Sequence, residues 1–128
     1  MKTINVVGAI IVKEGKIYAT QRGYGEFEGG WEFPGGKVED GESDDEALVR
    51  EIKEELDIVV EIDGFFHKVD YRYEKFRLIM NCYLCHIVSG VPKLIEHSNA
   101  KWLGKKDIKS VEWLPADVEI VDKLLDEI

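Results

Sequence analysis

The sequence predicts an α+β fold in which strands outnumber helices. Strand-forming aliphatic and aromatic residues gather in several separate stretches, whereas only two segments carry the signals of a helix. The first of these segments is acidic and follows a glycine-rich turn, and the second opens at Pro115 and is expected to run to Ile128. Because neither a Pro/Ser-rich linker nor an internal repeat interrupts the chain, we expect one domain over residues 1–128.

The beginning of the chain predicts a β-hairpin followed by a loop. Residues 4–12 are strongly apolar, Gly15 offers a turn, and residues 16–21 return as a second strand. Residues 23–30 are rich in glycine and acidic side chains, which is typical of an irregular connection. The hairpin is therefore expected to lead into a flexible loop.

The acidic helix is expected to follow a break in strand structure and to precede several further strands. Before it, Pro34, Gly35 and Gly36 should break any strand and let the backbone approach a ligand closely. After it, β-branched and aromatic residues favour strands over residues 59–62, 65–73, 76–88 and 101–103.

The acidic helix is predicted to begin near Ser43. Ser43 and Glu46 have the spacing of a capping box, and Asp44 and Asp45 place negative charge in the first turn, where the helix dipole favours it. An apolar stripe along one side should face the core. The residues of this stripe are Leu48, Val49, Ile52 and Leu56.

Beside the apolar stripe, the helix carries glutamates at the spacing of metal ligands. Glu51, Glu54 and Glu55 fall within roughly a 100° arc of one helix face. Like charges at this spacing destabilise a helix unless a cation neutralises them, and oxygen ligands favour Mg²⁺ or Mn²⁺ over zinc. A solvated acidic surface is the alternative interpretation of the three glutamates taken alone.

The overall charge argues against a nucleic-acid polymer as ligand. A formal net charge of −9 repels polyanions at long range, whereas a small polyphosphate can have its charge screened by bound Mg²⁺. No apolar run approaches the roughly 20 residues that a membrane span needs, so we expect a cytoplasmic protein without a membrane partner. The sequence is compatible with a monomer and with a homodimer.

The cysteines and histidines do not form a metal or disulfide framework in the sequence. Cys82 and Cys85 are three residues apart in a predicted strand and should point to opposite faces, as packing residues. His67, His86 and His97 lack zinc-ligand spacing with one another or with the cysteines.

The acidic helix and the turn before it match a known signature. Five residues separate Gly36 from Glu42, and seven more lead to Arg50 and Glu51. This spacing resembles the signature of the Nudix hydrolases, G-x5-E-x7-R-E-U-x-E-E-x-G-U, where U is a bulky aliphatic residue. Asp57 is the single departure and stands in place of a glycine. Because Asp tolerates the left-handed backbone found at helix ends, this departure concerns a turn and leaves the metal ligands in place.

The resemblance extends beyond the signature to nearly the whole chain. Gln21 and Arg22, residues 31–36 and residues 114–117 all look like the MutT-like branch of the family, which includes CTP pyrophosphohydrolases. The resemblance implies an α/β/α sandwich with a mixed β-sheet. It also implies Mg²⁺-dependent hydrolysis of nucleoside triphosphates to nucleoside monophosphate and pyrophosphate. The implied role is the removal of modified or excess nucleotides, either 8-oxo-dGTP or cytidine-type nucleotides.

The resemblance further implies roles for individual residues. Arg50 would hold the glutamates in place, and either Glu51 or Glu96 would act as the general base. Glu96 lies six residues before Trp102, where an acid from a late loop assists in that branch; a solvated loop residue is the alternative. The implied ligands of Mg²⁺, or of Mn²⁺ in its place, are the Gly36 carbonyl and the carboxylates of Glu51, Glu54, Glu55 and Glu96.

Three residues are candidates for binding the substrate. Asp117, when ionised, only accepts hydrogen bonds, which suits an exocyclic amine such as N4 of cytosine, although Asp117 could instead cap or charge the start of its helix. Arg22 is a candidate contact to phosphate or base, or else a surface charge. Trp31 could stack on a base or fill the core.

Two other functions fit the same residues. The protein could hydrolyse another nucleoside diphosphate linked to a second group, such as a nucleotide sugar or a dinucleotide. It could also be a non-catalytic module that senses nucleotides, although the intact glutamates of the signature argue against this interpretation.

Overall fold

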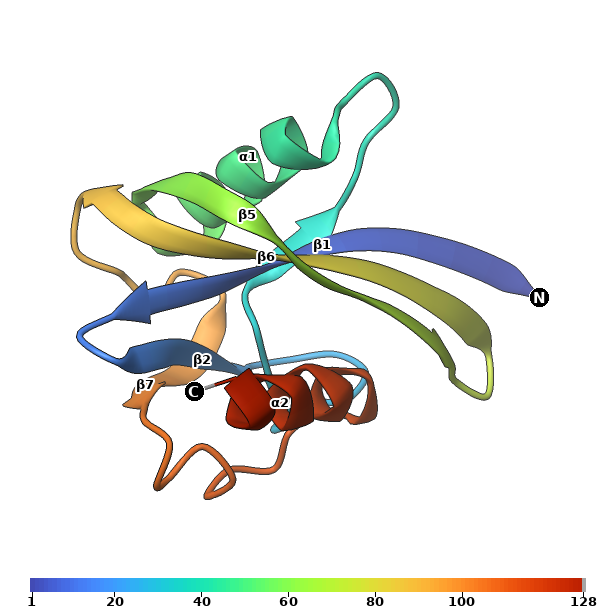
Figure 1. Ribbon diagram of the computed structural model, residues 1–128. Helices are drawn as coiled ribbons and strands as arrows, with labels where there is room; N and C mark the ends of the chain where they lie inside the picture. Colours follow the sequence, from blue (N-terminus) through green and yellow to red (C-terminus); the bar gives the residue numbers. More distant parts are fainter. Residues whose placement is uncertain (128) are drawn as a thin grey trace.

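The computed structural model describes residues 1–127 and confirms an α/β/α sandwich. Figure 1 shows α1 (Asp44–Leu56) and α2 (Pro115–Glu127) on opposite sides of the strands. The strands in this part of the chain are β1 (Lys2–Lys13), β2 (Lys16–Arg22), β3 (Trp31–Glu32), β4 (Gly35–Lys37), β5 (Val59–Arg72), β6 (Phe76–Ser89) and β7 (His97–Leu103). Ile128, the expected end of the second helix, lies outside the described residues. None of the helices within residues 1–127 has the length and apolar character needed to cross a membrane.

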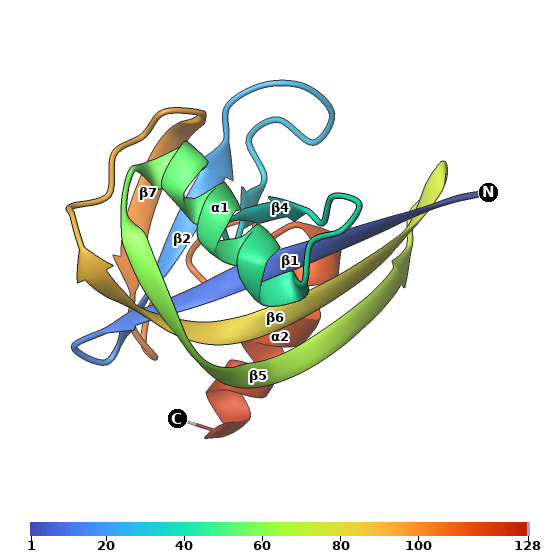
Figure 2. The ribbon, with the colours of Figure 1, turned by 90° about the horizontal axis from the view of Figure 1, so that it is seen from above.

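Strand β1 is the centre of a mixed sheet. The strands follow the order β3-β2-β1-β6-β5, with β4 also paired to β1 and β7 to β2. β1 runs parallel to β6 and antiparallel to β2 and β4. In Figure 2, β1 extends across the molecule from the N-terminus and passes beside α1 and β4.

The side chains of β1 alternate between two hydrophobic cores, as the two-residue period of a strand requires. Ile10 belongs to the α2-side core, which contains the buried residues of α2. Val7, Ala9 and Ile11 belong to the α1-side core, which contains the buried apolar residues of α1. One strand thereby attaches both helices to the same sheet.

The two cysteines confirm the alternation expected for β6. Cys82 is buried in the α2-side core, and Cys85 is buried in the α1-side core. Both are free thiols on opposite faces of one strand. Burial raises the pKa of the Cys85 thiol to about 12, so this side chain is an unreactive packing residue.

Helix α1 begins and ends as its sequence predicts. The Ser43 side chain accepts a hydrogen bond from the Glu46 amide, and the Glu46 side chain accepts one from the Ser43 amide. At the other end, Asp57 adopts a left-handed conformation with φ 54° and ψ 43°, where the signature of the family has glycine. The apolar stripe is correct except for Val49, which is 37% exposed.

Several strand boundaries differ from those expected. The segments 59–62 and 65–73 form one continuous strand, β5, because β-bulges near Gly64 absorb the irregularity while the pairing with β6 continues. The last strand begins at His97 rather than at residue 101, because β7 pairs with β2 as far as Arg22. Neither feature can be recognised from one strand alone.

The glycines expected to break strand structure form a short strand instead. Gly35 and Gly36 pair with Gly8 and Val7 of β1. A Cβ atom built on Gly35 would lie 1.9 Å from the carbonyl oxygen of Val7. The absent side chain thus lets β4 approach β1 more closely than any other residue type would permit.

This close approach predicts a large difference between two glycine-to-alanine substitutions. Gly35→Ala should lower the melting temperature by about 3–12 °C, since overpacking against the backbone costs about 1–3 kcal/mol. Gly64→Ala is the matched control, because a Cβ at Gly64 meets no atom within 4 Å. Thermal unfolding followed by circular dichroism measures both. Equal melting temperatures for the two variants would show that β4 has room to move away from β1.

Candidate functional site

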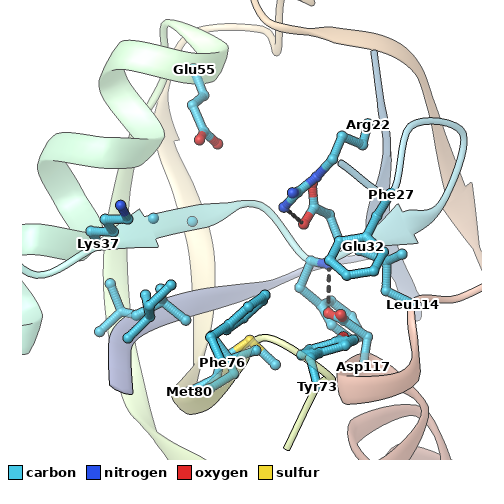
Figure 3. Close-up of a pocket in the computed structure, with 17 residues that line it drawn as sticks. Arg22, Phe27, Glu32, Lys37, Glu55, Tyr73, Phe76, Met80, Leu114 and Asp117 are labelled. Atoms are coloured by element: carbon cyan, nitrogen blue, oxygen red, sulfur yellow. Dashed lines mark hydrogen bonds and ion pairs between the residues drawn. The ribbon is translucent and has the colours of Figure 1, made fainter. Parts of the chain in front are cut away.

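A cavity of about 330 Å³ opens between the two helices. Its wall combines residues from β1, β4, the β5–β6 hairpin and both helices. Figure 3 shows Glu55 of α1 at one end of the cavity and Asp117 of α2 at the other, with Arg22 and Glu32 between them. The cavity therefore connects the glutamate-bearing helix with the residues predicted to contact a substrate.

Arg50 organises the carboxylates at the edge of this cavity. Its Nε and Nη2 atoms donate to the two carboxylate oxygens of Glu42 at 2.7 and 2.8 Å. Its Nη1 atom donates to Glu51 at 2.9 Å and to Glu54 at 3.2 Å, and Nη2 also reaches the Lys37 carbonyl at 3.1 Å. The hydrogen bonds that Glu42 accepts from Arg50 and from the Glu39 amide lower its pKa to about 2. The expected role of Arg50 in positioning glutamates agrees with this geometry.

Glu51 lies directly against Gly36 of β4. A Cβ atom on Gly36 would be 2.3 Å from the carboxylate carbon of Glu51, so only glycine permits this contact. Burial raises the pKa of Glu51, and the hydrogen bond from Arg50 opposes that shift. The Gly36 backbone and the Glu51 carboxylate, both predicted as metal ligands, are thereby neighbours.

Glu55 is buried without a complete set of hydrogen-bond partners. It is 8% exposed, and its Oε2 atom has no partner among the described residues. Burial raises the pKa of Glu55 to about 8, and the charges of Glu51, Glu96 and Glu32 add to the effect. A carboxylate in such surroundings is stabilised by a cation, so this end of the cavity suits a divalent metal ion.

The three glutamates of α1 that were expected to bind metal, Glu51, Glu54 and Glu55, do not converge on one point. Glu54 is 57% exposed on the solvent side of Arg50, whereas Glu55 faces the cavity. Within residues 1–127, no three His, Cys, Asp or Glu side chains are grouped closely enough to form a ready-made cation cage. The reason is that Arg50 itself neutralises Glu51 and Glu54. The three carboxylates therefore do not form the single patch expected from the helix spacing. Glu51 and Glu54 pair with Arg50, and Glu55 lines the cavity.

Glu96 lies close to Glu55 despite its distance in the sequence. Both line a smaller cavity of about 150 Å³, together with Arg22, Glu32 and His97. The charge of Glu96 contributes to the raised pKa of both Glu51 and Glu55. The structure thus brings the predicted acid of the late loop to the glutamate end of the site.

Arg22 is held by an acidic residue that the sequence did not single out. Its Nε and Nη2 atoms donate to the Glu32 carboxylate at 3.1 and 2.7 Å. The pair lines both cavities and so stands between them. Glu32 is adjacent to Trp31 in the sequence, but only the pairing of β2 with β3 places it beside Arg22.

Asp117 is a buried residue of the first turn of α2. It is 4% exposed, and its Oδ1 atom accepts a hydrogen bond from the Phe33 amide at 3.1 Å. Burial raises its pKa to about 8. This differs from the ionised acceptor expected from the sequence, because burial favours the neutral acid. Asp117 does not cap its helix, since Leu114 precedes Pro115 at the helix start.

Trp31 takes the second of its two expected roles and fills the core. It is buried in the α2-side core and lines neither of the two cavities described above. Phe33 lines the larger cavity and stacks on Trp113 with ring centroids 4.8 Å apart. Side chains of a strand alternate between faces, but the sequence does not show which face is turned toward a cavity.

Aromatic residues near the tip of the β5–β6 hairpin form a part of the cavity that sequence reasoning missed. Tyr73 and Phe76 stack at 5.0 Å, and Phe27 from the 23–30 loop packs on Tyr73 at 5.0 Å. All three line the cavity. In the sequence, aromatic residues such as Tyr73 and Phe76 favour strands but do not indicate that they line a cavity.

Comparison with known proteins agrees with this architecture. The NUDIX domain family matches residues 1–124. A CTP pyrophosphohydrolase of Escherichia coli is 34% identical over 98% of this chain and 93% of its own length. An 8-oxo-dGTP diphosphatase of Haemophilus influenzae is 34% identical over 98% of this chain and 94% of its own length.

A solved structure shows the same arrangement of elements. The crystal structure of a MutT NUDIX hydrolase from Burkholderia pseudomallei superposes with a TM-score of 0.89 at 29% identity. The match covers 97% of this chain and 99% of the other. With the family match over residues 1–124, and with Gly36 and Glu55 of the signature lining the cavity, the chain belongs to the NUDIX family of hydrolases.

Proposed function

We propose that the protein is a metal-dependent nucleoside triphosphate pyrophosphohydrolase, which releases nucleoside monophosphate and pyrophosphate. The observation that carries this proposal is the buried Oε2 atom of Glu55, which lacks a partner among the described residues and faces the cavity that contains Asp117. One end of the cavity suits a cation, and the other offers hydrogen bonds to a base. A Mg²⁺-bound nucleotide has both features.

The metal would be held by groups that the fold brings to the glutamate end. These are the Gly36 carbonyl, Glu51, Glu55 and Glu96, with Glu54 joining after a change of side-chain rotamer. Mg²⁺, or Mn²⁺ in its place, supplies positive charge that neutralises phosphate oxygens and makes water more acidic. The unpartnered oxygen of Glu55 and the proximity of Glu51 and Glu96 support this assignment.

Side chains of the protein would supply the general base and the residue that positions it. Glu51 is the better-placed general base, because Arg50 holds its Oε1 atom while burial raises its pKa toward the range that favours proton transfer. Glu96 is the alternative base. Arg50 acts on the reaction through Glu51 and Glu54 and so is a positioning residue.

The names of the relatives support nucleotides of two kinds as substrates. One relative is named for CTP and another for 8-oxo-dGTP. We infer that Asp117 and Arg22 contribute to base selection and that cytosine nucleotides or oxidised purine nucleotides are used. Removal of excess or damaged nucleotides from the pool is the corresponding role.

The first test concerns metal and products. Hydrolysis of a panel of triphosphates should stop in EDTA and return with Mg²⁺ or Mn²⁺, and Glu54→Gln should lower kcat by about 100-fold. Glu61→Gln, on the exposed side of β5, is the matched control. The panel includes nucleotide sugars and dinucleotides, scored for phosphate and pyrophosphate. Turnover of these compounds alone would assign the protein to a different diphosphate substrate, and full activity in EDTA would refute metal dependence.

The second test uses thermal stability and needs no turnover. The pKa of Glu55 is raised from 4.5 to about 8, so the folded state loses stability as pH rises through this interval. In EDTA at pH 8, Glu55→Gln should therefore melt about 3–6 °C above the wild type, with a smaller difference at pH 5. In Mg²⁺ the order should reverse, because the wild type gains a ligand. Identical responses of both proteins to Mg²⁺ would remove Glu55 from the metal site.

The third test concerns the base. Because the pKa of Asp117 is raised to about 8, its carboxylate form, which accepts from an amine, appears only as pH rises through that value. The ratio of kcat/KM for dCTP to kcat/KM for 8-oxo-dGTP should increase between pH 7 and 9. Asp117→Asn should abolish this rise and favour the purine by about 10- to 150-fold, the value of one charged hydrogen bond. A ratio that is independent of both pH and the substitution would restrict Asp117 to supporting the Phe33 backbone.

A further inference from the structure

Tyr73 is held from several sides at the wall of the cavity. Its amide donates to the Phe76 carbonyl at 2.8 Å, which closes the β5–β6 hairpin. Its ring stacks on Phe76 and contacts Phe27, with centroids 5.0 Å away in each case. The ring lines the same cavity as Asp117, and Figure 3 shows the two residues side by side. The position of the phenol is thus well defined.

The hydroxyl of Tyr73 acts as a cap for α2 from outside the helix. Helix α2 begins at Pro115, which has no N–H group, and the preceding Leu114 has no side-chain acceptor. The amide of Ala116 therefore donates to the Tyr73 hydroxyl oxygen at 3.1 Å. This bond fixes the hydroxyl one residue away from Asp117.

The same hydroxyl retains a donor that none of residues 1–127 accepts. A phenolic hydroxyl both donates and accepts, and here the described residues engage only its accepting lone pair. Burial raises the pKa of Tyr73, so the proton stays in place through the neutral range. The Oδ2 atom of Asp117 is also available to a ligand, because the Phe33 amide donates only to Oδ1. The cavity wall therefore presents a hydroxyl donor beside a carboxyl oxygen.

We infer that Tyr73 is a base-selecting residue whose hydroxyl donates to a ring nitrogen of the nucleobase while Asp117 binds the adjacent exocyclic amine. The inference deepens the function proposed above and rests on a nucleotide occupying this cavity. Cytosine presents the required pair, an N4 amine next to the N3 acceptor, and adenine presents N6 next to N1. On the Watson–Crick edge, guanine presents N1–H beside its N2 amine and uracil presents N3–H, so each places a donor opposite the Tyr73 donor.

The test compares dCMP with 3-deaza-dCMP, in which a C–H group replaces the N3 acceptor. Binding is measured by calorimetry at pH 9, where Asp117 is ionised. Wild-type protein should bind dCMP about tenfold more tightly than 3-deaza-dCMP, the effect of one hydrogen bond to a neutral donor. Tyr73→Phe should reduce this preference to less than about twofold by weakening dCMP alone.

Tyr71→Phe is the matched control. Its ring packs on Tyr73 with centroids 4.7 Å apart, but Tyr71 is absent from the cavity lining. This variant should keep the tenfold preference. If Tyr73→Phe weakens both ligands by the same factor, Tyr73 only supports α2 and the inference is overturned. A wild-type protein without preference for dCMP would overturn it as well.

The binding test is independent of hydrolysis. Absence of pyrophosphate release from every triphosphate would refute the proposed reaction, while a Tyr73-dependent preference for dCMP would still support the base contact. Conversely, efficient hydrolysis with no preference for the N3 acceptor would retain the enzyme and reject Tyr73 as its base-selecting residue.

Discussion

The close approach of glycine backbone to β1 and to α1 is the constraint on which the site depends. A side chain at Gly35 would collide with the Val7 carbonyl, and one at Gly36 would collide with the Glu51 carboxylate. The first contact joins β4 to the central strand, and the second places a carboxylate of α1 beside the backbone of β4. Both contacts require the absence of a Cβ atom. Hydrophobic packing of α1 can therefore bring its acidic face to the cavity without a collision with β4.

Each end of the cavity contains a buried carboxyl group, but the surroundings of the two groups differ. Glu55 and Asp117 both have a pKa raised to about 8 by burial. The neighbours of Glu55 include three further glutamates, so its environment favours the arrival of positive charge. Asp117 instead accepts a hydrogen bond from the Phe33 amide, and the opposing charges of Glu32 and Arg22 both act on it. The cavity thus has one end adapted to a cation and one adapted to directional hydrogen bonds, as phosphates and a base require.

Sequence reasoning succeeds where the determinants are local and fails where strand pairing decides the neighbours. The capping box, the left-handed Asp57, the first hairpin and the spacing from Gly36 to Glu55 are properties of short segments, and the structure has them as expected. The partnership of Glu32 with Arg22 and the position of Tyr73 beside α2 depend on register between distant segments. Trp31 shows a related difficulty, because its aromatic ring is equally suited to a core and to a ligand. The neutral form of Asp117 follows from burial that only the assembled fold reveals.

The pairing of β1 with β6 also has a consequence for folding. Lys2 lies opposite Phe76 and Ile11 opposite Cys85, so the central ladder joins segments from distant parts of the chain. Such contacts form only after a large loss of chain entropy, which makes them late and cooperative. Both hydrophobic cores share β1, so we expect the docking of the two helices to be coupled to this ladder. The signature segment therefore cannot assemble its geometry as an isolated peptide, and loss of nucleotide binding during denaturation should coincide with global unfolding rather than precede it.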